Sequence, residues 1–98
     1  MPGKNIKENI DYLHKIILAI DTLEECEAIF DDLCTKNELA SISQRLVVAK
    51  MLMDKKVYSD IVAETGASTA TISRVNRSLA YGKGGYEKLF AKIENSNK

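Results

Sequence analysis

A single glycine between two helical apolar stripes constrains the fold of this chain most. The positions expected to be buried before the glycine are Ile61, Val62 and Thr65, and those after it are Ile72, Val75 and Leu79. Each set has the spacing of one buried helix face. Gly66 stands where a left-handed backbone ends a helix, a conformation that glycine adopts without steric cost. The pattern predicts a helix-turn-helix, in which Ser68 caps the second helix.

The opposite face of the second predicted helix is small, polar and basic, and it carries no acid. Its members are Thr69, Ala70, Ser73, Arg74, Asn76 and Arg77. Hydroxyl, amide and guanidinium groups suit phosphate oxygens and guanine edges, whereas a structural hairpin usually carries both signs of charge. We therefore expect this face to enter the major groove of double-stranded DNA.

The rest of the chain is poor in helix breakers, since its one proline is Pro2 and it has five glycines. Without strand alternation, this composition predicts an all-α fold of about six short helices. The first helix is expected over about 5–20, and the last begins near Tyr86 and frays over 94–98. The run 82–85 (Gly-Lys-Gly-Gly) is expected to form a hinge, whose Lys83 touches the DNA backbone.

Capping signals mark the starts of the other predicted helices. They are Thr22 with Glu25 for the second helix, Thr35 with Glu38 for the third, and Ser59 for the helix that opens the DNA-binding unit. We expect the third helix to end at 54–56 (Asp-Lys-Lys).

Two predicted helices carry apolar residues at alternating steps of three and four, as in a coiled-coil seam. The stripes are Ile6, Ile10, Leu13, Ile17 and Ile20, then Leu39, Ile42, Leu46, Ala49 and Met53. For one helix alone, an ordinary core would explain such a stripe. With the second predicted helix, three amphipathic helices precede a minimal hairpin. This arrangement favours a homodimer, because a dimer reads two half-sites about 34 Å apart. We expect one domain over 1–98, with a dimerisation scaffold (1–57), a helix-turn-helix (58–81) and a C-terminal loop and helix (82–98).

Charge and composition exclude several classes of function. The 98 residues have no net charge, but acids dominate the first 35 residues and bases the remainder. The only histidine, His14, lies beside the first seam, and no metal-ligand spacing appears, so no enzyme is expected. Cys26 and Cys34 lie two helical turns apart, too far for a disulfide, and are expected in the core. No apolar run could span a bilayer and no signal peptide is apparent, so we expect a cytoplasmic protein.

The segment 66–74 (GASTATISR), followed by Asn76, Ser78 and Leu79, resembles the reading head of the Trp repressor family. With 24–26 (EEC), 32–35 (DLCT), 44–46 (QRL) and 81–86 (YGKGGY), the resemblance extends over about 13–90. The resemblance is closer still to the YerC/YecD branch of small Trp-repressor-like proteins of Gram-positive bacteria. The resemblance implies an all-α, intertwined homodimer that docks a helix-turn-helix on operator DNA.

Residue by residue, the resemblance assigns base-facing positions to Thr69, Ala70 and Ser73, and a phosphate-side position to Thr71. The whole predicted DNA-binding set is Ser68, Thr69, Ala70, Thr71, Ser73, Arg74, Asn76, Arg77 and Lys83. The resemblance also places Arg45, Arg74 and Ser78 around the family's bound tryptophan.

The sequence departs from the tryptophan-binding pattern. Val75 replaces a glycine, Arg77 replaces a small amide, and the segment between Arg45 and Arg74 is one residue shorter. We therefore expect no tryptophan and no other cofactor, although a different small-molecule effector stays open. Arg74 has three candidate partners, in the order DNA, a ligand carboxylate, and Asp60 or Glu64. The alternative function is a protein-interaction module that uses the helix-turn-helix only as a scaffold.

Overall fold

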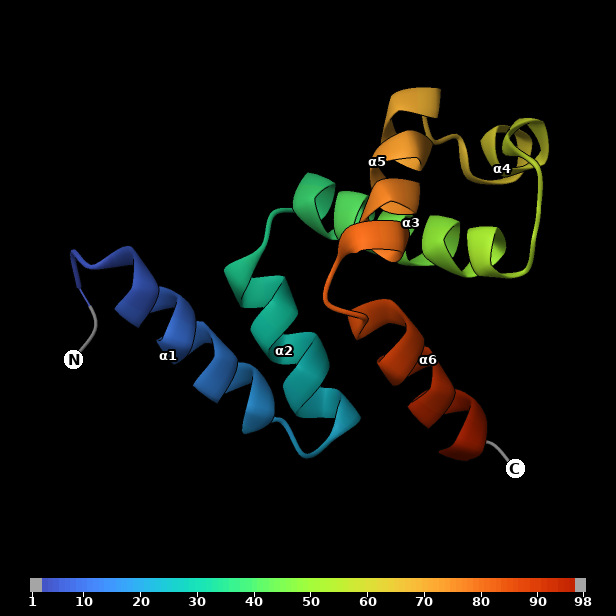
Figure 1. Cartoon of the computed structure of the whole chain (residues 1–98). Helices are drawn as coiled ribbons and strands as arrows, with labels where there is room; N and C mark the ends of the chain where they lie inside the picture. The colour runs from blue at the N-terminus through green and yellow to red at the C-terminus, as the bar shows by residue number, and fades with distance from the viewer. Residues whose placement is uncertain (1–2, 97–98) are drawn as a thin grey trace. The chain divides into compact units, whose positions relative to one another are not determined.

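The computed structural model describes residues 3–96, which form six helices and no strand. The helices are α1 (Ile6–Leu18), α2 (Leu23–Leu33), α3 (Lys36–Met53), α4 (Tyr58–Thr65), α5 (Thr69–Tyr81) and α6 (Gly85–Ser96) (Figure 1). The all-α prediction is confirmed. The chain divides into two compact units, one ending at Lys36 and one beginning at Asn37. No described helix is both long and apolar enough to cross a membrane.

The N-terminal unit contains α1 and α2, whose starts are fixed by side-chain caps. The Asn5 side chain accepts a hydrogen bond from the Glu8 N–H at 3.1 Å. Thr22 Oγ1 accepts from the Glu25 N–H at 3.1 Å, while Glu25 Oε1 accepts from the Thr22 N–H at 3.3 Å. The predicted capping box is therefore confirmed. Neither helix contains a buried residue, so this unit has no closed core of its own.

The two cysteines also belong to the N-terminal unit. Both Cys26 and Cys34 are free thiols and half-buried. The expectation that they are unbridged is confirmed, but they are less buried than core residues.

The C-terminal unit contains the hydrophobic core of the described chain. Its buried residues are Val48, Ala49 and Met51 from α3, Ile61 from α4, Ala67 from the turn, and Ile72 and Val75 from α5. Leu52, Leu79, Tyr86 and Phe90 pack against this core. The helix-turn-helix is therefore held on the C-terminal half of α3, and Tyr86 and Phe90 of α6 pack against the same core.

Three local predictions are wrong. Val62 is 37 % exposed, because the core side of α4 is defined by Ile61, one helical position away. The N-cap of α4 is Val57, whose backbone is extended and which makes no side-chain cap, so Ser59 lies inside the first turn. α6 continues through residues 94–96, where fraying was expected; residues 97–98 lie outside the described part.

The predicted stripe on α3 is only partly correct. Ala49 is buried, but Ile42 and Leu46 are exposed, and the core is formed instead by the neighbouring positions Val48 and Met51. α3 carries apolar residues on more than one side, so spacing alone does not identify the side that the same chain covers.

Candidate nucleic-acid interface

The turn between α4 and α5 is fixed by backbone geometry and by three hydrogen bonds. Gly66 has φ 74°, the left-handed conformation predicted for it. Thr65 Oγ1 donates to the Ile61 carbonyl at 2.7 Å and accepts from the Ala67 N–H at 3.1 Å. Gln44 Nε2 donates to the Thr65 carbonyl at 3.1 Å, which ties the turn to α3. These contacts set the angle at which α5 leaves the core.

The first turn of α5 is closed by Ser68, as predicted. Ser68 Oγ accepts from the Thr71 N–H at 3.1 Å and lies 3.0 Å from Thr71 Oγ1 in a second hydrogen bond. A cap of this kind satisfies one of the free backbone N–H groups of the helix start. Thr71 is half-buried beside this cap, so its hydroxyl belongs to the capping pair.

The outward face of α5 is open to solvent, while its inward face forms core. Ile72 and Val75 are buried, whereas the six residues of the predicted reading face are exposed: Thr69, Ala70, Ser73, Arg74, Asn76 and Arg77. Within residues 3–96 the side chains of this face make no hydrogen bond and no ion pair. The ion pair of Arg74 with Asp60 or Glu64, the third of its candidate interactions, is not formed. The donors of this face are free to meet an external partner.

Charge is divided between the two units. Residues 1–36 contain four basic and eight acidic side chains, a net charge of −4, and residues 37–98 contain ten and six, a net charge of +4. From Gly66 to Tyr86 there is no acidic residue at all. The positive potential of the protein is therefore concentrated on the unit that carries the helix-turn-helix.

Two of the three predicted effector-binding residues come together. Arg74 and Ser78 line one open concavity of about 270 Å³, together with Arg77, Tyr81 and Gly82. Arg45 does not line it; this arginine is exposed on α3, and its Nε donates to the carbonyl of Ser41 one turn earlier at 3.4 Å.

Val75, which stands where the tryptophan-binding pattern has a glycine, has its side chain in the core. Only 2 % of the residue is exposed, and it lines neither of the cavities beside α5.

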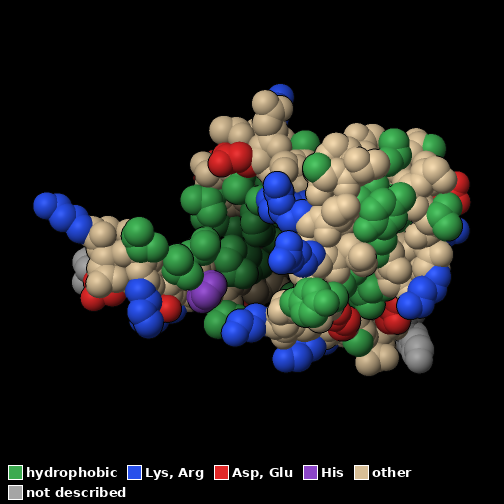
Figure 2. Space-filling view, turned by 45° about the horizontal axis from the view of Figure 1, so that its top comes forward, with side chains coloured by type: hydrophobic (Ala, Val, Ile, Leu, Met, Phe, Trp, Pro, Cys, Tyr) green, Lys and Arg blue, Asp and Glu red, His purple; other side chains and the backbone are tan. Residues whose placement is uncertain are grey.

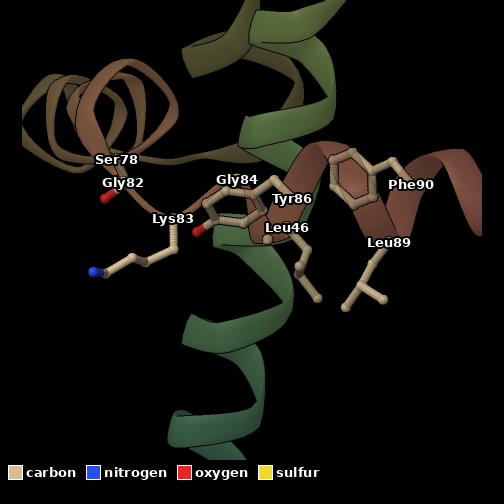
Figure 3. A pocket seen from close by; sticks show the side chains of 9 residues that line it. Leu46, Ser78, Gly82, Lys83, Gly84, Tyr86, Leu89 and Phe90 are labelled. Carbon is tan, nitrogen blue, oxygen red and sulfur yellow. The ribbon is translucent and has the colours of Figure 1, made fainter.

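A second cavity of about 420 Å³ lies where α5 turns into α6. It is lined by Leu46, Ser78, Gly82, Lys83, Gly84, Gly85, Tyr86, Leu89 and Phe90 (Figure 3). The rings of Tyr86 and Phe90 are 6.0 Å apart, and Lys83 extends away from the leucines and from Phe90 (Figure 3). This cavity is a largely apolar depression with an exposed lysine at its edge.

The connection itself requires glycine at Gly82. A Cβ built there would overlap the carbonyl oxygen of Ser78, one turn earlier in α5. Gly84 has φ 77°, a conformation that again favours glycine. The predicted hinge is therefore a defined bend between α5 and α6.

Sequence reasoning missed Tyr81, which is 85 % exposed at the end of α5. Its spacing of seven residues from Arg74 places it on the basic face and is the signal that could have found it. Among residues 3–96 no group of three or more metal-ligating side chains is found.

Comparison with known proteins identifies the family to which this chain belongs. The Trp repressor protein family model matches residues 8–94. This chain belongs to the Trp repressor family. The YerC protein of Bacillus subtilis (strain 168), itself described as uncharacterized, is 51 % identical over 87 residues, which cover 89 % of this chain and 84 % of YerC.

Two solved structures of the same kind are similar to this chain. The crystal structure of a proposed Trp repressor from Staphylococcus aureus is 48 % identical and has a TM-score of 0.84, covering 89 % of this chain and 87 % of its own. A TrpR-like protein from Eubacterium eligens ATCC 27750 is 49 % identical and has a TM-score of 0.85, covering 89 % and 90 %. The family is regulatory rather than enzymatic.

Proposed function

We propose that this protein is a bacterial transcriptional regulator, a repressor, that binds specific DNA sequences in the major groove as a homodimer. The observation that carries the proposal is the acid-free outer face of α5. This face is exposed and has no side-chain partner among residues 3–96, on a helix that the core, the Ser68 cap and the Gly66 turn hold in place. A bacterial regulator that binds the chromosome acts in the cytoplasm, where the chromosome lies.

Base choice is assigned to the first turns of α5. A recognition helix enters the groove with its N-terminal residues nearest the base edges. Thr69 and Ser73 offer hydroxyl groups there, and Ala70 offers a methyl group to a thymine methyl. Each base contact of this kind is worth about 1–3 kcal/mol of discrimination. Arg74, Arg77 and Lys83 add charge for the backbone.

Homodimerisation is supported by apolar surface that this chain leaves uncovered. On α1, Ile6, Ile10 and Leu13 are exposed on one seam, and Leu89 and Ile93 are exposed on α6. Figure 2 shows hydrophobic side chains at the surface of the molecule. Large apolar side chains exposed along one face of a helix mark an interaction site. A second copy is the proposed partner, because a two-fold dimer lets the same seam cover itself and supplies two reading helices.

Regulation without tryptophan is part of the proposal. The family's ligand position would need Arg45 and Arg74 to converge, and Arg45 donates instead to its own helix. Val75 contributes its volume to the core. A different small molecule is not required for the reading face to be exposed.

The test is the base preference of matched hydroxyl variants. Thr69→Ala and Ser73→Ala should relax selectivity at one base position each and lower affinity for the preferred site by about 1–3 kcal/mol. Ser96→Ala, which removes an exposed hydroxyl at the end of α6, is the control. The measurement is fluorescence anisotropy against every single-base variant of the preferred site. Unchanged base preference in both α5 variants would favour the protein-interaction alternative.

A further inference from the structure

An open groove lies between α3 and α4, away from the basic face of α5. It is lined by Ala40, Ser43, Gln44 and Val47 of α3 and by Glu64 and Thr65 of α4. Its volume of about 410 Å³ is in the range of small-molecule sites. None of these residues belongs to the predicted DNA-binding set or to the family's ligand position, so the chemistry of the groove is separate from both.

The polar groups of this groove are hydrogen-bond acceptors. Gln44 Nε2 donates to the Thr65 carbonyl at 3.1 Å, which leaves the amide Oε1 to accept. Ser43 Oγ donates its proton to the Ala40 carbonyl at 3.1 Å, which leaves the lone pairs of the hydroxyl. The Glu64 carboxylate has no hydrogen bond and no ion pair among residues 3–96. Three acceptor groups therefore line a groove whose lining includes no basic side chain.

Charge and apolar surface favour one class of ligand for the groove. Asp60 lies four residues before Glu64 on the same side of α4, and within residues 3–96 neither carboxylate pairs with a basic side chain. The α4 wall is therefore negative, although residues 37–98 have a net charge of +4. On the α3 wall, Val47 is 51 % exposed. A primary ammonium group has three N–H donors for the three acceptors, and a short aliphatic stem would cover Val47.

The groove lies on the contact that ties the helix-turn-helix to α3. The hydrogen bond from Gln44 to the Thr65 carbonyl joins its two walls, immediately before the turn into α5. A ligand that bridges Glu64 and Ser43 would add a second tie beside this bond. DNA binding would then have less motion of α4 and α5 to restrict, so the ligand and DNA would bind with positive cooperativity.

We propose that this groove is an effector site for a small aliphatic molecule with a primary ammonium group. Glu64, Gln44 and Ser43 bind the ammonium group, and the bound molecule tightens the helix-turn-helix on α3. Binding at the groove is independent of the proposed function, whereas the effect on DNA affinity rests on it.

The first arm of the test is an NMR titration of the full chain with n-butylammonium chloride. Tetramethylammonium chloride is the control ligand, because it has the same charge but no N–H donor. n-Butylammonium should give saturable shifts of the Gln44 side-chain amide and of the Gly66 N–H, larger than those from tetramethylammonium. Glu64→Gln should weaken binding about fivefold, the upper end for an exposed ion pair. Glu27→Gln, which changes an exposed acid on α2, should leave binding unchanged. Equal shifts from the two cations, or undiminished binding by Glu64→Gln, would overturn the site.

The second arm measures affinity for the preferred DNA site by fluorescence anisotropy, with the two salts at equal concentration. n-Butylammonium should raise the affinity of the wild type relative to tetramethylammonium, and this gain should be absent in Glu64→Gln. If the NMR shifts are present but the affinity is unchanged or lowered, the effector role is overturned and the proposed function stands. If no specific DNA is selected, the proposed function and the effector role fail together, while the NMR arm still decides the ammonium site.

Discussion

Valine-to-alanine substitution at two positions of the helix-turn-helix should lower the free energy of unfolding by different amounts. Val75 of α5 is 2 % exposed in the core, whereas Val62 of α4 is 37 % exposed, although helical spacing predicted both to be buried. Both sit in helix interiors, so the gain from the higher helix propensity of alanine, about 0.6 kcal/mol, is shared and cancels in the comparison. The difference between Val75→Ala and Val62→Ala therefore isolates burial.

The magnitude follows from the exposures. Full burial of two methyl groups is worth about 1.6 kcal/mol, of which nearly all is lost at Val75 and about 1 kcal/mol at Val62. A cavity of about 50 Å³ at Val75 adds about 1.2 kcal/mol. After the propensity gain, we expect Val75→Ala to destabilise the fold by about 2 kcal/mol and Val62→Ala by about 0.4 kcal/mol.

The assay is urea denaturation followed by circular dichroism, with all variants at one protein concentration, since a dimer's stability depends on it. Equal m-values allow the two midpoints to be compared directly. A cost at Val62 that equals or exceeds the cost at Val75 would refute the packing described here. It would mean that a partner covers the outer side of α4.

Three further outcomes are expected. Ser68→Ala should cost about 1 kcal/mol in the same denaturation assay, because the cap of α5 is lost, and Ser68→Asp should retain most of the stability. Hydrogen bonds to Asp54 first and to Glu94 second raise the pKa of Lys50 above its ordinary value of 10.5. The stabilisation that these two hydrogen bonds give to the folded state is therefore complete below pH 10.5 and is lost as the pH rises through the folded-state pKa of Lys50. In the Lys50→Met variant, urea midpoints measured over this alkaline range should not show the loss. Leu13→Glu, on the α1 seam, should convert a sedimenting dimer into a monomer at micromolar concentration, whereas an unchanged dimer would exclude this seam from the interface.

Local structure was predictable where one residue's own chemistry determines the backbone. Gly66 is left-handed, and Thr22 and Ser68 cap their helices as predicted, because glycine geometry and side-chain capping act within four residues. Ser59 failed as a cap because helix α4 begins one residue after Val57, and that start depends on how α3 ends.

Predictions that depended on neighbouring helices were less reliable. Val48 and Met51 form the core of α3, while Ile42 and Leu46 are exposed, and both pairs fit a helical apolar stripe. Which stripe is covered within one chain depends on how the other helices dock, and spacing contains no such information. Tyr81 is a different case, because its spacing of seven residues from Arg74 on the same helix is visible in the sequence.

The central claim is that two copies of α5 read one DNA site. Selection from random oligonucleotides at moderate salt, followed by sequencing of the bound pool, tests it most directly. The claim predicts enrichment of a two-fold symmetric sequence whose half-sites lie about 34 Å, one helical turn, apart. A bound pool without any enriched sequence would contradict DNA reading, and a single asymmetric half-site would contradict the dimer.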